Sequence, residues 1–315
     1  MLPDNHWYGH RSILLNYLGL KDRKIFASIM HGWVSQCHYR AIKKRSSTFF
    51  PYLVWNEKVA NFFLKKKIKN VIPIGAPFLY LCRINYIKLA KKNLANFLPA
   101  GLIFFPPHSG QDYKRDINHE KFIKKIRKIN KGPYTVCLYY YDMKAEVVAI
   151  YKKYNFRVIC CVKSRTDVNS LYNLYEEILK HKYVIVGELN SPLFYSMYLK
   201  KKVRVILDEE EFKNKTDQIS LDTIFLNNFY KKKYPKLFTS FFSIDKAYEL
   251  SKIELGESSL KSKKKLKEIL GINSILKIFF AYVFSVLYDI KYGKGLRKGA
   301  DLSKKKLSQY IKVAR

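Results

Sequence analysis

The sequence predicts an α/β protein built on parallel sheets, and two observations carry this prediction. Short, continuously apolar runs alternate along the chain with helical patterns, which is the arrangement of a parallel sheet covered by helices on both faces. Polar residues and turn formers follow several of these runs, at the strand ends where α/β proteins hold their ligands. At 315 residues the chain is long enough for two such units.

The first unit, residues 1–98, begins with a polar and aromatic segment that contains Asp4 and Arg11 and leads into a helical stretch at 12–20. Apolar runs predict strands at 24–32 and 49–56, and a third strand with a Gly-Ala-Pro turn within 70–81. Between and after them, helices are expected at 57–67 and 84–97.

The second unit, residues 99–255, is more regular, since apolar runs alternate strictly with helical patterns. The expected strands lie at 101–106, 134–141, 156–162, 183–189 and 203–208. The expected helices lie at 118–129, 144–154, 168–181 and 192–201. Because the carboxyl ends of parallel strands meet at one edge of a sheet, we expect a nucleotide site there. It would draw on His108, Ser109, Gly110, Tyr141, Asp142, Ser164, Arg165, Glu188, Ser191 and Pro192.

Beyond residue 209 the pattern loosens, with helical stretches at 243–250 and 261–270 and a basic helical region at 256–315. Within it, the apolar segment 275–290 is flanked by lysines and has two interpretations. It can lie in a membrane interface and be held by anionic lipid, or it can pack back against the first unit. No run approaches the roughly 18 uninterrupted apolar residues of a membrane span.

The composition is strongly basic, with 60 Lys and Arg against 25 Asp and Glu and a formal charge of +35. Such an excess predicts attraction to nucleic acid, acidic lipid or phosphorylated substrates. The alternative is compositional, because the richness in Lys, Asn, Ile and Tyr is typical of AT-rich coding. The five cysteines show no paired spacing and the N-terminus has no signal pattern, which together predict a cytoplasmic protein.

Three short motifs can carry chemistry. His31, followed by Gly32, can act as a general base toward an acceptor hydroxyl, or it can be a hydrogen-bonded turn residue. His108 opens a turn fixed by two prolines, whose amides and hydroxyls can hold a phosphate; its alternative is an ordinary loop position. Ser191 and Pro192 read as an N-cap and first helical residue, a helix start that also suits a diphosphate or a ribose.

Other enzyme classes lack their motifs in this chain. There is no P-loop, no GxGxxG fingerprint, no HExxH pair and no GxSxG elbow. The histidines and cysteines have no zinc-like spacing, and no DxD pair is present to hold a metal and diphosphate. We therefore expect no metal and no tightly bound cofactor.

Six blocks of the chain resemble proteins of bacterial O-antigen and capsule clusters that look like GT-B glycosyltransferases. The blocks are HGW (31–33), VWNE (54–57), IGAPFLYL (74–81), GLIFFPPHS (101–109), LYYYD (138–142) and SPLFYSMYLKKKV (191–203). The pattern is more distantly similar to CDP-glycerol glycerophosphotransferases and bacterial sialyltransferases. The likeness covers roughly residues 4–207 and thins after them.

The resemblance implies two Rossmann-like domains facing a cleft, with the acceptor on the first and a nucleotide-activated sugar on the second. His31 matches a catalytic histidine of the glycerophosphotransferase pattern, and Ser191 matches a donor-contacting serine. Ser196 stands where that pattern has a small apolar residue, and the sialyltransferase HP dipeptide is absent, with HS at 108–109 as an analogue only.

The function that this resemblance implies is a metal-independent glycosyltransferase of bacterial surface polysaccharide synthesis. Its acceptor would be a glycolipid or lipid-linked oligosaccharide at the inner face of the plasma membrane. His31 would be the base, with Arg11 on an acceptor phosphate or in a surface salt bridge, and Asp4, Asp112 and Glu188 as candidate carboxylates. The alternatives are a polyol-phosphate transferase, a basic nucleic-acid-binding protein and a non-catalytic membrane-surface scaffold.

Overall fold

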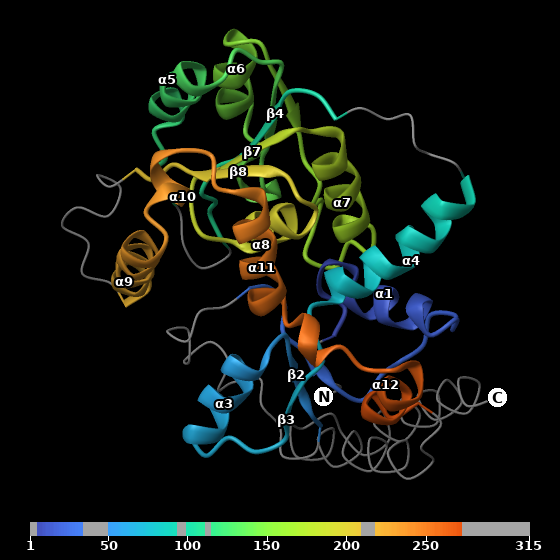
Figure 1. The fold of residues 1–315 in the computed structure, drawn as a ribbon. Helices are drawn as coiled ribbons and strands as arrows, with labels where there is room; N and C mark the ends of the chain where they lie inside the picture. The colour runs from blue at the N-terminus through green and yellow to red at the C-terminus, as the bar shows by residue number, and fades with distance from the viewer. Residues whose placement is uncertain (1–4, 34–49, 93–98, 111–114, 209–217, 273–315) are drawn as a thin grey trace, which may run out of the picture.

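The computed structural model describes residues 5–33, 50–92, 99–110, 115–208 and 218–272, and it confirms an α/β fold (Figure 1). The first sheet has the order β1-β2-β3, formed by β1 (Ser28–Ile29), β2 (Tyr52–Val54) and β3 (Val71–Pro73). The second has the order β6-β5-β4-β7-β8, formed by β4 (Leu102–Phe105), β5 (Tyr134–Cys137), β6 (Phe156–Ile159), β7 (Tyr183–Val186) and β8 (Lys202–Val205). Every strand pairing in the two sheets is parallel.

The helices of the first half follow the expected order, with one difference in length. They are η1 (Trp7–Gly9), α1 (His10–Tyr17), α3 (Glu57–Lys65) and α4 (Pro77–Lys92). The Asn56 side chain caps α3 by accepting from the Val59 amide at 3.0 Å. The expected start of the next helix at residue 84 is wrong, since α4 already begins at Pro77. Proline is favoured at a first helical position because its missing N–H would have no partner there.

In the second half each of the strands β4 to β7 is followed by a helix, and the strands are shorter than predicted. The helices are α5 (His119–Ile129), α6 (Ala145–Lys153), α7 (Ser170–Lys180) and α8 (Ser191–Tyr198). The run predicted as a strand at 134–141 leaves the sheet after Cys137 and ends in the short helix η2 (Tyr140–Asp142). The expected cap of α8 is wrong by one residue: Asn190 is the N-cap and accepts from the Leu193 amide at 3.1 Å.

The chain after residue 217 links the two halves. It forms α9 (Gln218–Lys233), α10 (Lys236–Thr239), α11 (Ile244–Leu255), η4 (Glu257–Ser259) and α12 (Lys263–Leu270). In Figure 1, α11 runs from the larger sheet toward the smaller one. At the end of α11 the Leu255 carbonyl accepts from the Ala76 amide at 2.8 Å. At the end of α12 the Leu270 carbonyl accepts from the Phe26 amide at 3.1 Å. Residues 255–272 therefore pack on the first half, while the segment 275–290 lies outside the described residues.

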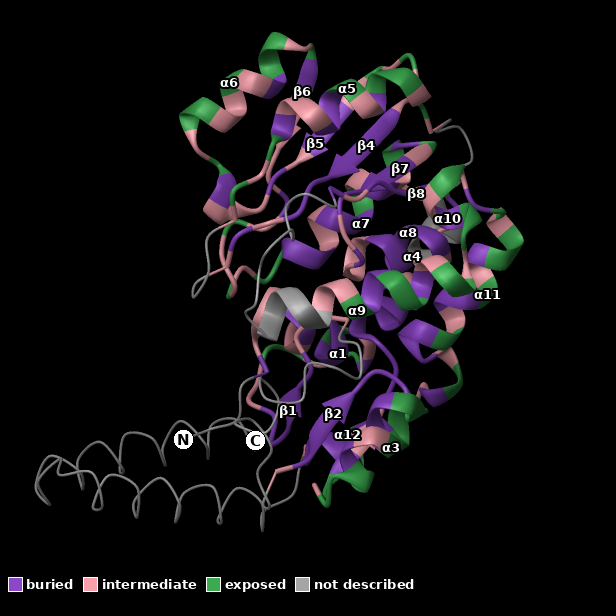
Figure 2. Cartoon of the chain, turned by 90° about the vertical axis from the view of Figure 1, so that its left-hand side faces the viewer, coloured by how far each residue is buried: buried purple, intermediate pink, exposed green. Residues whose placement is uncertain are grey.

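One hydrophobic core runs through both halves of the chain (Figure 2). Its clearest joint is the stacking of Phe78 on Tyr195, with ring centroids 4.0 Å apart, which packs α4 of the first half on α8 of the second. A separate apolar cluster lies under α5 and α6 on the other face of the larger sheet. Because the main core crosses between the halves, the boundaries at 98/99 and 255/256 stay predictions.

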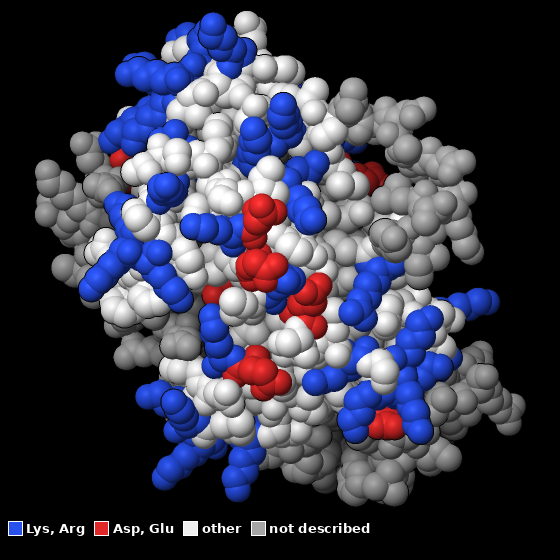
Figure 3. Space-filling model, viewed as in Figure 1, with Lys and Arg blue, Asp and Glu red and all other residues white. Residues whose placement is uncertain are grey.

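The charged surface is uneven. In Figure 3, lysines and arginines lie around the periphery of the visible face, while acidic side chains gather near its middle. None of the helices in the described part of the chain combines the length and apolar character needed to cross a membrane.

Candidate functional site

The larger sheet contains a topological switch point between β4 and β7. Numbered along the chain, its five strands have the spatial order 3-2-1-4-5, so the connections leave β4 and β7 in opposite directions. The loops that follow these two strands, 106–110 and 187–190, therefore lie at the position where doubly wound sheets open to a ligand. The predicted residues His108, Ser109, Gly110 and Glu188 lie in these two loops, and Ser191 directly follows the second.

A cluster of three ionisable side chains, His108, Arg115 and Glu188, connects the two loops. The Arg115 guanidinium lies 2.8 Å from one carboxylate oxygen of Glu188, and His108 Nε2 lies 3.8 Å from the other. The second ring nitrogen of His108, Nδ1, lies 2.9 Å from the Ser109 carbonyl oxygen, which orients the ring. Arg115 and Glu188 are both largely buried, whereas His108 is about one third exposed. His108 is thus the accessible member of this group, and sequence reasoning did not single out Arg115.

The turn at Ser109 is not free to hold a phosphate in the way expected from the sequence. The Ser109 amide donates at 2.9 Å to the carboxylate of Asp142, a side chain buried at η2. The Ser109 hydroxyl accepts from the Arg115 amide at 3.2 Å. Both groups of Ser109 already have partners, so they are not available to a phosphate. The Asp142 carboxylate beside the amide would also repel an anion. Ser109 and Asp142 fix the loop that carries His108.

Aromatic residues surround His108 and connect it to the N-terminal segment. The Tyr139 ring lies 4.5 Å from the His108 ring between centroids, and Tyr139 Oη lies 2.8 Å from Tyr8 Oη. Burial, and then the neighbouring Tyr8, raise the pKa of Tyr139, so its hydroxyl stays protonated. Tyr140 and Tyr141 pack beside it, with centroids 4.2 Å apart. These tyrosine side chains combine a hydroxyl donor with a flat apolar ring, a combination that suits a nucleoside.

Arg165 brings a cation to the same place. The Arg165 guanidinium lies 5.6 Å from the Trp7 ring, and the Arg165 backbone carbonyl accepts from the Tyr8 amide at 2.8 Å. Partial burial lowers the pKa of Arg165, but the hydrogen bond to Tyr139 and the neighbouring Tyr8 and Tyr140 together outweigh this effect and raise the pKa. The approach between segments is close, because a Cβ on Gly9 would lie 2.1 Å from the Val168 carbonyl oxygen. The N-terminal segment is therefore packed against the loop that follows β6.

The loop after β1 meets the beginning of α8. The Trp33 amide donates to Ser191 Oγ at 2.8 Å, and a Cβ on Gly32 would lie 3.4 Å from the same oxygen. Because Asn190 caps the helix, the Ser191 hydroxyl is available for this contact. The structure therefore brings the His31–Gly32–Trp33 segment to the loop that also carries Glu188.

Trp33 is held on three sides. Its indole N–H donates to Glu254 Oε2 at 3.0 Å, and its ring lies 4.6 Å from Phe194 between centroids. Glu254 is buried on α11 and also accepts from Lys58 at 3.2 Å, while its backbone carbonyl accepts from Asn56 at 2.8 Å. One buried carboxylate thus ties α11 to both α3 and the His31 loop. Glu254 gave no signal in the sequence, since nothing marks a single acid on a surface helix as buried.

His10 lies fully buried beside His31. Burial, and to a smaller extent the nearby His31, lower the pKa of His10 to about 3, against a hydrogen bond with the Met30 backbone that raises it. Among the described residues, no hydrogen-bond partner reaches His10 Nδ1 or the indole nitrogen of Trp55, whose ring centroid lies 6.5 Å from that of His10. His10 is therefore neutral at physiological pH. Its place next to the proposed base could not be read from the sequence, where it lies 21 residues before His31.

Of the remaining predicted residues, the structure describes three: Arg11, Ser164 and Pro192. Arg11 pairs with Asp22 at 3.1 Å on the surface, which supports the salt-bridge interpretation over an acceptor contact. Ser164 Oγ lies 3.3 Å from Thr166 Oγ1, at the edge of the site. Pro192 is in the first turn of α8, and its carbonyl accepts from the buried Ser196 hydroxyl at 2.7 Å, so a serine is satisfied at this apolar position. Asp4 and Asp112 lie outside the described residues.

No group of three or more His, Cys, Asp or Glu side chains within the described ranges is arranged to hold a metal ion. The absence of a metal from the proposed chemistry stays a prediction.

Comparisons with known proteins give only distant likenesses. No protein-family model matches the chain, and no curated protein matches it. Among solved structures, the chain is similar to the wall teichoic acid polymerase TagF at 13% identity and a TM-score of 0.36. That match covers 78% of this chain and 64% of TagF. A second TagF structure, H548A, matches at 13% identity and a TM-score of 0.32, and covers 79% of this chain and 65% of TagF.

The chain is also similar to the UDP-GlcNAc 2-epimerase from Neisseria meningitidis bound to UDP-GlcNAc. The identity is 13% and the TM-score 0.33, over 70% of this chain and 60% of the epimerase. The chain thus spans less than two thirds of the length of each of these proteins. Likenesses this weak assign no activity, ligand or acceptor to the chain.

Proposed function

We propose that this protein is a glycosyltransferase of the GT-B type that moves a sugar from a nucleotide-activated donor to a hydroxyl acceptor. One observation carries the proposal: the Trp33 amide donates to Ser191 Oγ at 2.8 Å. This contact brings the loop of His31, from the first half, to the β7–α8 turn at the switch point of the second half. Transfer between two substrates requires that a base and a nucleotide site be held close together, and this contact joins the two loops that would carry them.

On this proposal the second half holds the donor. The tyrosines after β5 offer flat faces and hydroxyl donors to the nucleoside, and Arg165 supplies a cation for the phosphates. His108 is the exposed ring at the switch point: its Nδ1 donates to the Ser109 carbonyl, and in the protonated ring its Nε2, faced by Glu188, would donate to a phosphate. Fixed donors of this kind stabilise the charge that develops on the departing phosphate without rearranging during the reaction.

His31 is the proposed base. It takes the proton of the acceptor hydroxyl while the hydroxyl oxygen bonds to the anomeric carbon of the sugar. The bond from that carbon to the phosphate oxygen breaks, and the nucleotide leaves with the electron pair. Histidine suits this step because it accepts a proton near neutral pH. The neighbouring His10 stays neutral, since burial holds its pKa at about 3, and so it adds no charge that would oppose protonation of His31.

The acceptor we propose is a glycolipid or a lipid-linked oligosaccharide in the synthesis of a bacterial surface polysaccharide. The formal charge of +35 supports work close to an anionic membrane surface, at the cytoplasmic face. The proposal includes no metal, because arginine, histidine and hydroxyl donors can offset the charge of the leaving group.

Two other functions remain as alternatives. A polyol-phosphate transferase would use the same donor half but move a phosphodiester, so its product would carry the additional phosphate mass. A nucleic-acid-binding protein would use the basic surface, with aromatic side chains as stacking platforms. Against it, several of the largest aromatic side chains, Trp55, Tyr52 and Tyr80 among them, are buried in the core and cannot stack on bases.

The experiment is a thermal-shift series with nucleoside mono- and diphosphates of uridine, cytidine and guanosine. A binding nucleotide raises the melting temperature with its concentration. The double variant His108→Ala/Arg165→Gln should lose the shift, and Lys264→Glu on the distant helix α12 should keep it. If no nucleotide stabilises the protein, and DNA binds with a steep salt dependence, the transferase proposal is wrong and the nucleic-acid alternative replaces it.

A further inference from the structure

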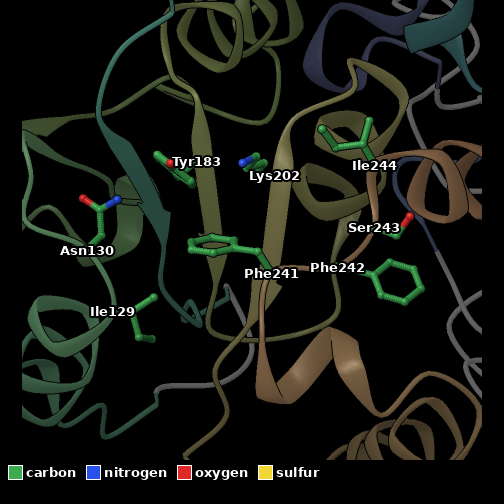
Figure 4. A pocket seen from close by; sticks show the side chains of 8 residues that line it. All are labelled: Ile129, Asn130, Tyr183, Lys202, Phe241, Phe242, Ser243 and Ile244. Atoms are coloured by element: carbon green, nitrogen blue, oxygen red, sulfur yellow. The ribbon is translucent and has the colours of Figure 1, made fainter.

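A hollow of about 520 Å³ lies at the opposite edge of the larger sheet from the candidate site. It opens over Tyr183 and Lys202, the first residues of β7 and β8, whereas the candidate site lies at the carboxyl ends of the strands (Figure 4). Ile129, at the end of α5, forms one wall, and Phe242 and Ile244, at the start of α11, form the other. The volume is within the range of small-molecule sites.

The floor of the hollow is aromatic and cationic. The Phe241 ring lies 5.0 Å from the Tyr183 ring between centroids. The ammonium of Lys202, which lines the hollow, lies 5.7 Å from the centroid of the same tyrosine. It forms no ion pair with a described carboxylate, and the residues that line the hollow include no acid. A cation with no counter-charge beside an aromatic floor favours an anionic ligand.

Polar groups at the rim can orient such a ligand. The Ser243 hydroxyl precedes α11 but makes no capping bond, so it can donate to a bound anion. Asn130 lies across the hollow, where its side-chain oxygen accepts from the Gly132 amide at 2.7 Å and thereby turns the amide NH₂ away from that backbone (Figure 4). Apolar walls, the Lys202 ammonium and these donors together fit a ligand with one flat ring and one acidic group.

We propose that this hollow, lined by Ile129, Asn130, Tyr183, Lys202 and Ser243, binds a small organic anion that carries a planar ring. The ring lies against Tyr183 and the isoleucine walls, and the acidic group lies between the Lys202 ammonium and the Ser243 hydroxyl. A nucleoside monophosphate and an aromatic carboxylic acid share this chemistry. The site is independent of the proposed transferase reaction, because it uses none of the residues at the switch point.

The test is NMR of the full chain with labelled isoleucine methyl groups. Ile129 and Ile244 report on the hollow, and Ile13, in the core of the first half, is the internal control. The probes are naphthalene-2-sulfonate, its neutral analogue naphthalene-2-methanol, and inorganic sulfate, which has the charge without the ring. Uridine monophosphate and 4-hydroxyphenylacetate then distinguish the two natural sources, since the tighter binder of these two identifies the ligand class.

We expect saturable shifts of the Ile129 and Ile244 signals with naphthalene-2-sulfonate and none at Ile13. The neutral analogue and sulfate should each bind at least about tenfold more weakly, since each lacks one half of the interaction. Lys202→Gln should weaken sulfonate binding about tenfold, and Lys264→Glu should leave it unchanged. The proposal is overturned if the sulfonate causes no saturable shift up to about 10 mM, a concentration that would detect even millimolar affinity. Equal binding of the neutral analogue, or unchanged binding by a folded Lys202→Gln protein, would also overturn it.

Discussion

The Trp33 amide and the Ser191 hydroxyl form a 2.8 Å hydrogen bond between residues 158 positions apart. The contact joins the loop after β1 to the first turn of α8, and it is made by the residue two positions after His31. Around it, the Trp33 indole reaches Glu254 at 3.0 Å and its ring packs on Phe194. The position of His31 relative to the second half therefore rests on a small number of named interactions that can be removed one at a time.

Replacing Ser191 by alanine should destabilise the protein by about 1–2 kcal/mol, because the partly buried Trp33 amide would lose its acceptor. The measurement is urea unfolding at neutral pH. Ser164→Ala is the matched control, since that hydroxyl is more exposed and bonds only another hydroxyl, so its effect should stay below about 0.5 kcal/mol. Equal stability of the Ser191→Ala protein and wild type would show that the contact does not fix the loop.

Glu254 should matter more than other acids of α11. Glu254→Ala leaves Lys58 and the Trp33 indole without their shared acceptor, and we expect a loss of about 2–3 kcal/mol. Glu249→Ala on the same helix is the control, since Glu249 pairs with Lys252 on the surface and exposed pairs contribute less than about 1 kcal/mol. Tryptophan fluorescence should shift to longer wavelength in the Glu254 variant alone, because Trp33 would become more exposed.

Two glycines share the same positive φ but differ in their surroundings, so alanine substitutions at the two positions distinguish the cost of backbone strain from that of steric contact. Gly19 and Gly256 both have φ of +73°, but a Cβ on Gly256 would lie 1.8 Å from the Trp55 carbonyl oxygen, whereas nothing lies within 4 Å of one on Gly19. Gly19→Ala should cost about 1 kcal/mol from the backbone conformation alone. Gly256→Ala must also push α11 away from Trp55, so it should cost about 3 kcal/mol or more. Thermal unfolding of the two variants gives the difference directly, and similar melting temperatures would contradict the close approach.

The stability of the protein should fall in mild acid because of His10. Its pKa is lowered from 6.5 to about 3 in the folded state, so the unfolded chain binds a proton that the folded chain does not. The contribution is fully present above pH 6.5 and is lost progressively as the pH falls toward 3, with a total on the order of several kcal/mol. Urea unfolding between pH 7.5 and 5, on wild type and His10→Gln, measures this slope. The slope should be smaller in the variant, and identical slopes would show that His10 titrates normally.

The fold could be predicted from the sequence more completely than the site. The alternation of apolar runs and helical patterns correctly gave parallel strands, because it depends on local burial. It failed at Pro77, where a helix start resembled a turn, and at Asn190, where two adjacent residues could each cap the helix. The helices at 218–233 and 236–239 were not expected. Their apolar residues are placed to meet the rest of the chain and do not show a clear helical period in the sequence.

For the site, the sequence placed His108 and Glu188 after strands whose carboxyl ends share one edge of the sheet, and the structure brings the two side chains within 3.8 Å. It could not show that the Ser109 amide is already held by Asp142, because that depends on a buried contact between residues 33 positions apart. Arg115, Glu254 and His10 were missed for the same reason. Each acts through a distant partner, and only the folded chain brings the two together.

The central claim is that His31 takes the acceptor proton in a sugar transfer whose donor is held by the second half. The direct measurement is nucleotide release, with mass spectrometry of the product, from wild type and His31→Ala. Membrane lipid extract would serve as the acceptor, with the nucleotide sugars of the base that stabilises the protein as donors. We expect a glycosylated lipid product, a rate lower by about 100-fold or more in His31→Ala, and unchanged nucleotide binding by that variant. A His31→Ala protein with near wild-type turnover, or a product that carries a phosphodiester instead of a sugar, would contradict the account.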